Sequence, residues 1–230
     1  MYGRNPVREA LRGRRAVHRV LATSQASREA WLRGVAVRVV PSSEELERLS
    51  GSREHQGICA ECEPYPYVEP ESLLAGRAPT IVALDELQDP QNLGAICRTA
   101  ECAGAGGVVI CERRAAGVTP AVCKASAGAV EHLPIARVRN LVEFLALAKA
   151  RGCWCYGAAA EAGDDYGSLD YSGGGVVLVL GAEGRGLRRL VAERCDALVA
   201  VPLEGQIGSL NVGAAAAVLL YEVLRQKKVA

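Results

Sequence analysis

Long hydrophobic runs are missing from this 230-residue chain, and none approaches the ~20 residues that a helix needs to cross a bilayer. The first residues, Met1 to Pro6, also lack the apolar stretch of a signal peptide. Half of the residues are hydrophobic and 23% are charged, as in ordinary globular proteins. We therefore expect a cytoplasmic protein without membrane contact, long enough for one large or two small domains.

The chain also has few candidate metal ligands. Its nine cysteines are odd in number and mostly lie singly in apolar stretches, where free cysteine behaves as a small hydrophobic residue. Cys59 and Cys62 form the only CxxC motif, in an expected strand whose period of two points the thiols to opposite faces. No second CxxC completes a set of four ligands. We predict that the protein has no metal site.

The overall charge of +1 hides an uneven distribution. Residues 1–40 contain nine arginines and two glutamates, a net charge of +7, whereas residues 41–80 contain eight glutamates and three arginines, a net charge of −5. A local basic surface on a nearly neutral chain favours an RNA-contacting module. A solvated helix face is the alternative interpretation.

Short strands and helices alternate over residues 1–63 and predict a small N-terminal α/β domain. The expected strands span residues 17–22, 35–40 and 57–60, and the expected helices span residues 7–11, 27–34 and 43–49. Asn5 is the expected N-cap of the first helix, with Pro6 at its first position, and Ser43 caps the third. Three prolines and a glycine among charged residues make residues 64–78 an expected linker.

From residue 79 to residue 230 the alternation is stronger, and it predicts a mainly parallel sheet covered by helices on both faces. The expected strands span residues 80–85, 107–111, 153–159, 176–180 and 197–201. The expected helices span residues 93–103 and 210–226, and two more begin after Thr119 and Asn140. Thr119 precedes a proline, and Asn140 with Glu143 makes a capping-box pattern, so both begin helices.

Three segments of this second domain each follow an apolar run and carry polar residues on a turn that opens a helix. They are residues 92–100, 181–186 and 209–212. In a parallel α/β sheet, ligands bind outside the carboxyl ends of the strands. We therefore expect four polar side chains to converge in one site: Asn92, Arg98, Glu183 and Asn211.

The glycine segment at residues 181–186 indicates which kind of ligand the site binds. Its glycine spacing is the reverse of the dinucleotide-binding pattern GxGxxG, and Glu183 would repel a pyrophosphate at a helix N-terminus. A nucleoside cofactor without phosphates and with positive charge fits better, which describes S-adenosylmethionine. A simple glycine turn with an acidic cap is the alternative.

The helix after residue 92 is expected to bury one stripe, made of Leu93, Ile96, Cys97 and Ala100. Gly94 and Arg98 lie on another face, where Gly94 offers a notch and Arg98 can bind a phosphate or a sugar hydroxyl. The alternative is an ordinary surface pair of Arg98 with Glu101. In the third segment, Ser209 or Asn211 can instead be a simple N-cap.

Together the three segments resemble the SpoU (TrmH-type) 2′-O-ribose RNA methyltransferases of the SPOUT superfamily, over nearly the whole chain. The matching residues are Asn92-x-Gly94-x-x-x-Arg98-Thr99-Ala100, Leu180-Gly181-Ala182-Glu183-Gly184, and Pro202 followed by Ser209-Leu210-Asn211-Val212. Residues 3–11 and 55–58 resemble the family's substrate-binding domain, which is similar to a ribosomal-protein fold. Gly208 stands where relatives often carry serine. The branch that the chain resembles most is the bacterial 23S rRNA guanosine-2′-O-methyltransferases.

The resemblance implies a C-terminal domain with a deep trefoil knot, a homodimer with cofactor sites near the subunit interface, and S-adenosylmethionine as cofactor. It implies cofactor contacts at Gly181, Val201 and Leu210. It implies five catalytic residues: Arg98, Asn92, Glu183, Ser209 and Asn211. Since a guanidinium normally stays protonated, we expect Arg98 to stabilise the developing alkoxide or to lose its proton only transiently.

The expected reaction is methylation of a ribose 2′-hydroxyl, on a guanosine of 23S rRNA, although the residues themselves do not identify the target nucleotide. The alternatives are a tRNA 2′-O-methyltransferase, a non-catalytic RNA-binding or ribosome-assembly protein that keeps the fold, and a nucleotide-binding reductase. The last helix carries more apolar surface, from Gly213 to Val223, than one helical stripe needs. Part of it is therefore expected to bury against a second subunit in a two-fold dimer.

Overall fold

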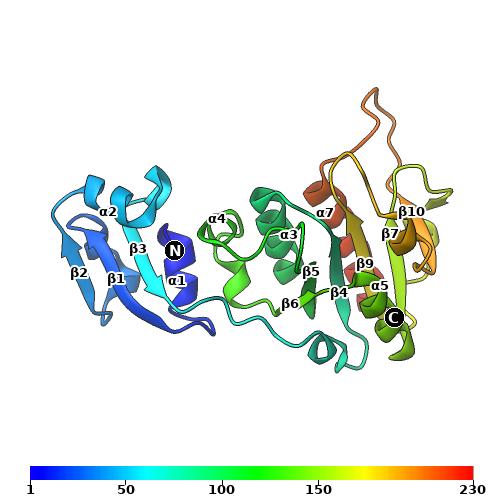
Figure 1. Cartoon of the computed structure of the whole chain (residues 1–230), viewed down its shortest axis with the longest axis horizontal. Coiled ribbons are helices and arrows are strands. Elements are labelled where there is room, and N and C mark those ends of the chain that lie inside the picture. The colour runs from blue at the N-terminus through cyan, green and yellow to red at the C-terminus, as the bar shows by residue number, and fades with distance from the viewer. Residues whose placement is uncertain (230) are drawn as a thin grey trace.

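The computed structural model describes residues 1–229 as two α/β units joined by an extended segment (Figure 1). The N-terminal unit has a three-stranded sheet of order β2-β1-β3, with β1 at Val17–Thr23, β2 at Val37–Val40 and β3 at Ile58–Cys62. β1 pairs parallel with β2 and antiparallel with β3. Helix α1 (Arg4–Ala10) buries Val7 against one face of this sheet, and α2 (Ser43–Ser50) buries Leu46 against the other.

The two thiols of the CxxC motif lie as the strand period predicts. Cys59 packs in the cluster around Leu46, whereas Cys62 packs against the cluster around Val7, on the opposite face. Within residues 1–229 no group of three or more His, Cys, Asp or Glu side chains could hold a metal ion. In the same range no helix is long and apolar enough to span a membrane.

Three details of the N-terminal unit differ from expectation. Helix α1 begins at Arg4, so the predicted N-cap Asn5 and first helical residue Pro6 both lie inside the helix. The backbone N–H of Gly3 donates to Ile58 O (3.1 Å) and so attaches the start of the helix to β3. The helix expected at residues 27–34 is two separate 3-10 turns, η1 (Ala26–Arg28) and η2 (Ala30–Leu32), divided at Glu29 by an extended backbone. Helix α2 is capped by Ser42, whose Oγ accepts from the backbone N–H of Glu45.

The second unit contains a seven-stranded sheet of order β6-β5-β4-β9-β7-β10-β8, in which every pair is parallel. Its strands are β4 (Thr80–Asp85), β5 (Gly107–Cys111), β6 (Ile135–Val138), β7 (Cys153–Ala158), β8 (Asp164–Asp165), β9 (Gly175–Gly181) and β10 (Ala197–Ala200). The predicted strands at residues 80–85 and 107–111 are confirmed. The edge strands β6 and β8 were not predicted, and the two residues of β8 are too few for a clear pattern.

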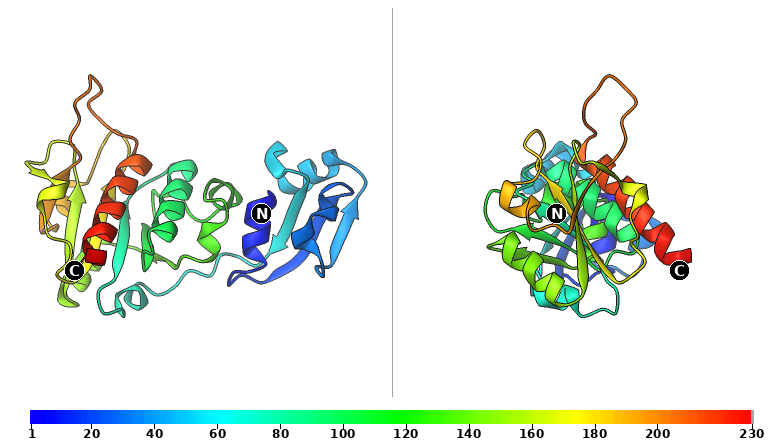
Figure 2. Two further views of the ribbon diagram at one scale, coloured as in Figure 1. Left: turned by 180° about the vertical axis from the view of Figure 1, so that it is seen from behind. Right: turned by 90° about the vertical axis from the view of Figure 1, so that its right-hand side faces the viewer.

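Helices cover both faces of the large sheet. Val82 and Leu84 pack on one face with α3 (Pro90–Cys102), α4 (Pro120–Ala125) and α7 (Val212–Val229). Ile81 and Ala83 pack on the other face with α5 (Leu141–Ala150) and the short α6 (Arg189–Ala192). The end-on view in Figure 2 has α7 and α5 on opposite sides of the strands. The trefoil knot implied by the resemblance stays a prediction.

Capping side chains determine where the helices of the second unit begin. Thr119 and Asn140 accept hydrogen bonds from the backbone N–H groups of Val122 and Val142, which confirms both predicted caps. Helix α3 begins earlier than predicted, because Asp89 accepts from the backbone N–H groups of the second and third helical residues at 3.1 and 3.2 Å. This cap includes Asn92 in the first turn of α3, close to the end of β4.

Residues 64–78 run along the second unit. The backbone of Val68 pairs with Ala136 at the edge of β6, and Tyr65 donates to Leu133 O (2.7 Å). A 3-10 turn, η4 (Pro70–Leu74), buries Leu73 and Leu74 under the sheet. The two units are therefore joined through packed residues as well as through the chain.

A buried ion pair also links the units. Arg15 of the N-terminal unit lies 2.7 Å from Glu131 of the second, with side chains 8% and 1% exposed. The guanidinium of Arg15 also lies over the ring of Tyr65 at 5.2 Å. One of the nine arginines expected to face RNA is thus used to hold the two units together.

Candidate functional site

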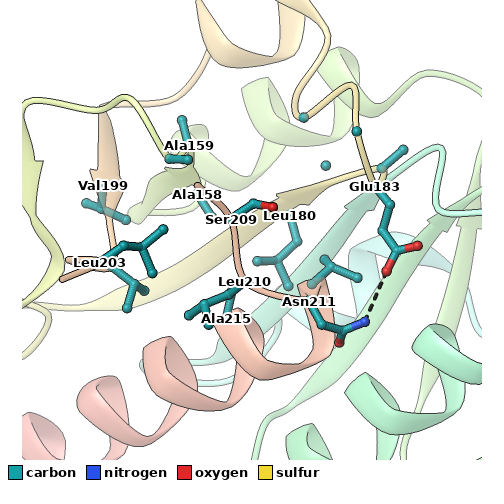
Figure 3. A pocket seen from close by; sticks show the side chains of 17 residues that line it. Ala158, Ala159, Leu180, Glu183, Val199, Leu203, Ser209, Leu210, Asn211 and Ala215 are labelled. Atoms are coloured by element: carbon teal, nitrogen blue, oxygen red, sulfur yellow. Dashed lines mark hydrogen bonds between the residues drawn. The ribbon is translucent and has the colours of Figure 1, made fainter. Parts of the chain in front are cut away.

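A cavity of about 480 Å³ opens at the carboxyl ends of β7, β9 and β10 (Figure 3). Its floor is apolar and comes from strand-end residues such as Leu180 and Val199, together with Leu203. Its walls are the turn at residues 181–186 and the segment at residues 209–212. The cavity therefore lies at the strand edge where the sequence predicts a ligand.

Three side chains from distant segments form one hydrogen-bonded cluster beside this cavity. The Nδ2 amide of Asn92 donates to Oε1 of Glu183 at 2.7 Å. The Nδ2 amide of Asn211 donates to the same carboxylate oxygen at 3.0 Å and to Oδ1 of Asn92 at 2.9 Å. Figure 3 shows the contact between Asn211 and Glu183 as a dashed line. This cluster ties α3, the turn after β9 and the start of α7 to each other.

Asn211 also caps the helix that it precedes, α7. Its Oδ1 accepts from the backbone N–H of Gly213 at 2.9 Å and so caps the first turn of α7. The N-cap interpretation and the functional interpretation of Asn211 are therefore both compatible with its geometry, since its two side-chain atoms serve different partners.

The turn at residues 181–186 needs glycines because its backbone folds back closely on itself. A side chain on Gly181 would bring a Cβ within 2.1 Å of the backbone carbon of Gly186. Gly184 and Gly186 have φ values of 74° and 63°, which favour glycine. The reversed glycine spacing thus closes a turn that carries Glu183 toward the asparagines.

The predicted cofactor contacts Gly181, Val201 and Leu210 all line the cavity, as does Ser209. The cavity has the size of a small-molecule site, and a mainly apolar floor beside the carboxylate of Glu183 suits a nucleoside that carries a positive charge. These residues fit S-adenosylmethionine. Apolar side chains would hold the adenosine, and Glu183 gives the rim negative charge.

Arg98 lies apart from this cluster. It is exposed on α3, six residues from Asn92 and so about 9 Å further along the helix axis. It does not line the cavity, and within residues 1–229 its side chain has no hydrogen bond or ion pair. The alternative surface pair with Glu101 is therefore not formed.

The prediction that Gly94 leaves an open notch on α3 is wrong. Gly94 is buried against α4, and an added Cβ would lie 2.4 Å from the Cβ of Ala125 and 2.8 Å from the backbone nitrogen of Ser126. Glycine is needed here because it lets α3 and α4 approach closely, and the space is filled by α4 instead of a ligand. The predicted buried stripe of Leu93, Ile96, Cys97 and Ala100 is confirmed.

The sequence did not reveal a second anchor of the turn. Asp85, at the end of β4 and 1% exposed, accepts from the backbone N–H of Arg188 (2.8 Å) and from its Nε (2.7 Å). The same guanidinium lies 3.1 Å from Glu86, and its hydrogen bond to Asp85 raises the pKa of Arg188. Arg188 therefore holds the end of the turn against the sheet. The only available signal was a pair of acidic residues at the end of a buried strand, Asp85 and Glu86.

Comparison with known proteins agrees with this geometry. Residues 79–221 match the family model of the SpoU rRNA methylase family, and residues 1–68 match that of RNA 2′-O ribose methyltransferase substrate binding. The chain is 39% identical to the TrmH family tRNA/rRNA methyltransferase YacO of Bacillus subtilis, over 98% of this chain and 94% of that protein.

Solved structures with the same fold include methyl-donor complexes. The SpoU methyltransferase AviRb from Streptomyces viridochromogenes, in complex with AdoMet, has a TM-score of 0.84 at 25% identity, covering 99% of this chain and 89% of that one. An AdoMet-bound rRNA methyltransferase from Sinorhizobium meliloti has a TM-score of 0.82 at 27% identity, covering 98% and 86%. The cavity with its three-segment cluster thus lies in a fold that is known with AdoMet bound. The chain belongs to the SpoU (TrmH-type) family of S-adenosylmethionine-dependent RNA methyltransferases.

Proposed function

We propose that the protein methylates the ribose 2′-hydroxyl of a guanosine in 23S rRNA. The observation that carries this proposal is the cluster of Asn92, Glu183 and Asn211 beside a cavity suited to the methyl donor. Further support comes from the match of residues 1–68 to a substrate-binding model of 2′-O ribose methyltransferases. The motifs resemble those of the 23S rRNA guanosine-2′-O-methyltransferases, which supports a guanosine of 23S rRNA as the target.

The proposed reaction leaves a limited task to the protein. S-adenosylmethionine, when bound, supplies the electrophilic methyl group, so the chain must orient the attacking oxygen and assist its deprotonation. Glu183 holds both asparagine amides, which fixes the rim where a ribose would enter. We assign Ser209 and Asn211 to the ribose side of this rim. Arg98 would stabilise the negative charge that develops on the 2′-oxygen.

We also propose that Arg98 acts from a dimer interface. It is exposed on α3, which packs against α7, and Ala95 on α3 and Ala214 and Tyr221 on α7 are exposed as well, the last of these 51% exposed. Small and aromatic residues without charge suit an isologous contact between two copies. Because Arg98 does not line the cavity of its own chain, the contact would let it serve the cavity of the second copy.

The dimer can be tested with Tyr221→Glu, since Tyr221 is exposed and its replacement disturbs no core packing. Sedimentation should find a dimeric wild type and a largely monomeric, folded variant. A wild type that is monomeric at micromolar concentration would overturn this part of the proposal.

The RNA surface of the N-terminal unit is smaller than its charge suggests. Arg4, Arg8, Arg12 and Arg19 pair with glutamates of the same unit, and Arg15 is buried. Five exposed arginines of this unit form no ion pair within residues 1–229: Arg14, Arg28, Arg33, Arg38 and Arg48. Arg14 donates to His132 O, so the other four are the candidates for RNA contact.

The reaction is tested by incubating the purified protein with S-adenosylmethionine and unmethylated 23S rRNA or tRNA, followed by nuclease digestion and mass spectrometry. We expect 2′-O-methylguanosine from 23S rRNA. A tRNA product would select the alternative substrate, which the names of the relatives also allow. A base-methylated product, or no methyl transfer to either RNA, would contradict the proposal.

A further inference from the structure

Glu86 is a buried carboxylate in an unusual backbone conformation. It directly follows β4, has a φ of 57°, and is only 6% exposed. Left-handed backbone is unfavourable for a residue other than glycine, and it persists where the surroundings impose it. Oε1 of Glu86 lies 3.1 Å from Arg188, whereas Oε2 has no hydrogen-bond partner.

Two further guanidinium groups surround this carboxylate. Arg114 lies 3.8 Å from Oε1 of Glu86, and Arg185 lies 3.8 Å from Oε2. These distances are too long for hydrogen bonds, so neither side chain uses its N–H donors on Glu86. Their side chains are 74% and 65% exposed, respectively. Arg188 differs, because its donors are occupied by Asp85 and Glu86.

These charged groups lie directly beside the methyl-donor cavity. A second cavity of about 280 Å³ is lined by Glu86, Arg185 and Arg188, and it shares Ala182 and Gly186 with the first. A single turn of the chain therefore separates the two spaces. Arg185 and Arg188 line this cavity, and Arg114 approaches Glu86 from outside the lining. Together the three guanidinium groups exceed the two buried carboxylates, Asp85 and Glu86, by one positive charge.

We propose that Arg114 and Arg185 bind a backbone phosphate of the RNA strand that carries the target nucleotide. An exposed guanidinium with free donors matches a phosphate in charge and in its paired hydrogen bonds. Glu86 is a positioning residue, since its buried charge attracts both guanidiniums to one carboxylate. This inference rests on the proposed RNA substrate. It adds the place on the protein where the backbone of that RNA is bound.

The test uses the full-length protein and a fluorescein-labelled single-stranded oligoribonucleotide. Binding is measured by anisotropy between 50 and about 300 mM salt for Arg114→Gln, Arg185→Gln and the double variant. We expect the affinity to fall by about tenfold or more, the scale of a lost hydrogen bond to a charged group. The slope of log affinity against log salt should become shallower by about 0.7 for one lost phosphate contact.

Two controls separate phosphate binding from a structural effect. Arg189→Gln removes a neighbouring arginine that is 81% exposed and pairs with Glu193 at 2.9 Å, and it should leave both affinity and slope unchanged. Replacing Arg114 and Arg185 with lysine keeps the charge and should retain the salt slope. Calorimetry should find the affinity of the double glutamine variant for S-adenosylmethionine within about twofold of wild type, since both residues lie outside that cavity.

An unchanged salt slope in the double variant would overturn the inference. So would a tenfold loss of S-adenosylmethionine affinity, because the arginines would then act by holding the turn. Failure of the proposed function is recognised separately, by mapping the methyl group. A product methylated on a base would refute ribose methylation, while the salt slope would still report on the phosphate site.

Discussion

At the residue scale, the outstanding feature of the site is the separation of Arg98 from the polar cluster that it was expected to join. Asn92, Glu183 and Asn211 are in direct contact, whereas Arg98 is exposed and unpaired within residues 1–229. A side chain without partners contributes little to folding. The geometry therefore predicts that replacing Arg98 leaves the fold stable, whereas the catalytic role proposed above predicts a loss of activity.

We expect Arg98→Ala to unfold at the wild-type temperature and to bind S-adenosylmethionine normally, while methyl transfer falls by roughly 100-fold or more, the scale of losing a charge-stabilising group. Single-turnover rates and calorimetry measure both quantities. Glu101→Ala, a change at an exposed neighbour on the same helix, is the control and should keep full activity. Wild-type rates in the Arg98 variant would remove it from the mechanism.

At the element scale, the turn after β9 depends on two charged residues, Asp85 and Arg188, that lie outside the lining of the methyl-donor cavity. Arg188 lies 46% exposed, yet its guanidinium and backbone bind Asp85, which is almost fully buried. Arg188→Ala would leave a buried carboxylate short of partners, at a cost of roughly 2–3 kcal/mol of stability. We expect S-adenosylmethionine affinity to fall with it, since the turn lines the cavity. Arg189→Ala should change neither the stability, measured by urea unfolding, nor the affinity for S-adenosylmethionine, measured by calorimetry.

The last helix, α7, carries a pH-dependent contact. Glu222 accepts from Arg225 (2.6 Å) and Gln226 (2.7 Å), and these bonds, Arg225 first, lower its pKa to about 2. A carboxyl whose folded pKa lies below its ordinary value stabilises the fold above that value, and the gain is lost as the pH falls. Glu222→Gln should therefore destabilise the protein at pH 7, and the difference from wild type should vanish between about pH 4.5 and 2. A difference that stays constant over that range would contradict this account of Glu222.

At the scale of the whole molecule, the two units are joined through the buried pair of Arg15 and Glu131. Removing Arg15 leaves Glu131 uncompensated in a site that is 1% exposed. We expect Arg15→Ala to lower the free energy of unfolding by about 3–5 kcal/mol, the scale for breaking a buried pair. Arg12→Ala, which removes an exposed pair with Glu9, should cost less than about 1 kcal/mol. Equal effects in urea unfolding would show that the junction is not held by this pair.

Local patterns in the sequence were sufficient for much of the second unit. The strands at residues 80–85 and 107–111 and the caps Thr119 and Asn140 were predicted correctly, because apolar runs and capping side chains act over a few residues. The N-terminal unit was predicted less well. Its first helix is positioned by a hydrogen bond from Gly3 to Ile58, a contact across most of the unit that no local pattern contains.

The sequence by itself determined that the chain is a two-part α/β protein and that three polar segments follow buried strands, since hydrophobic periodicity and residue type are local properties. Only the tertiary structure decided that Glu183 meets both asparagines, that Gly94 packs against α4, and that Arg98 stands apart. These outcomes depend on strand order and on the approach of helices far apart in the chain. Asp85 and Arg188, separated by 103 residues, form a contact for the same reason: β4 and β9 are neighbours in the sheet.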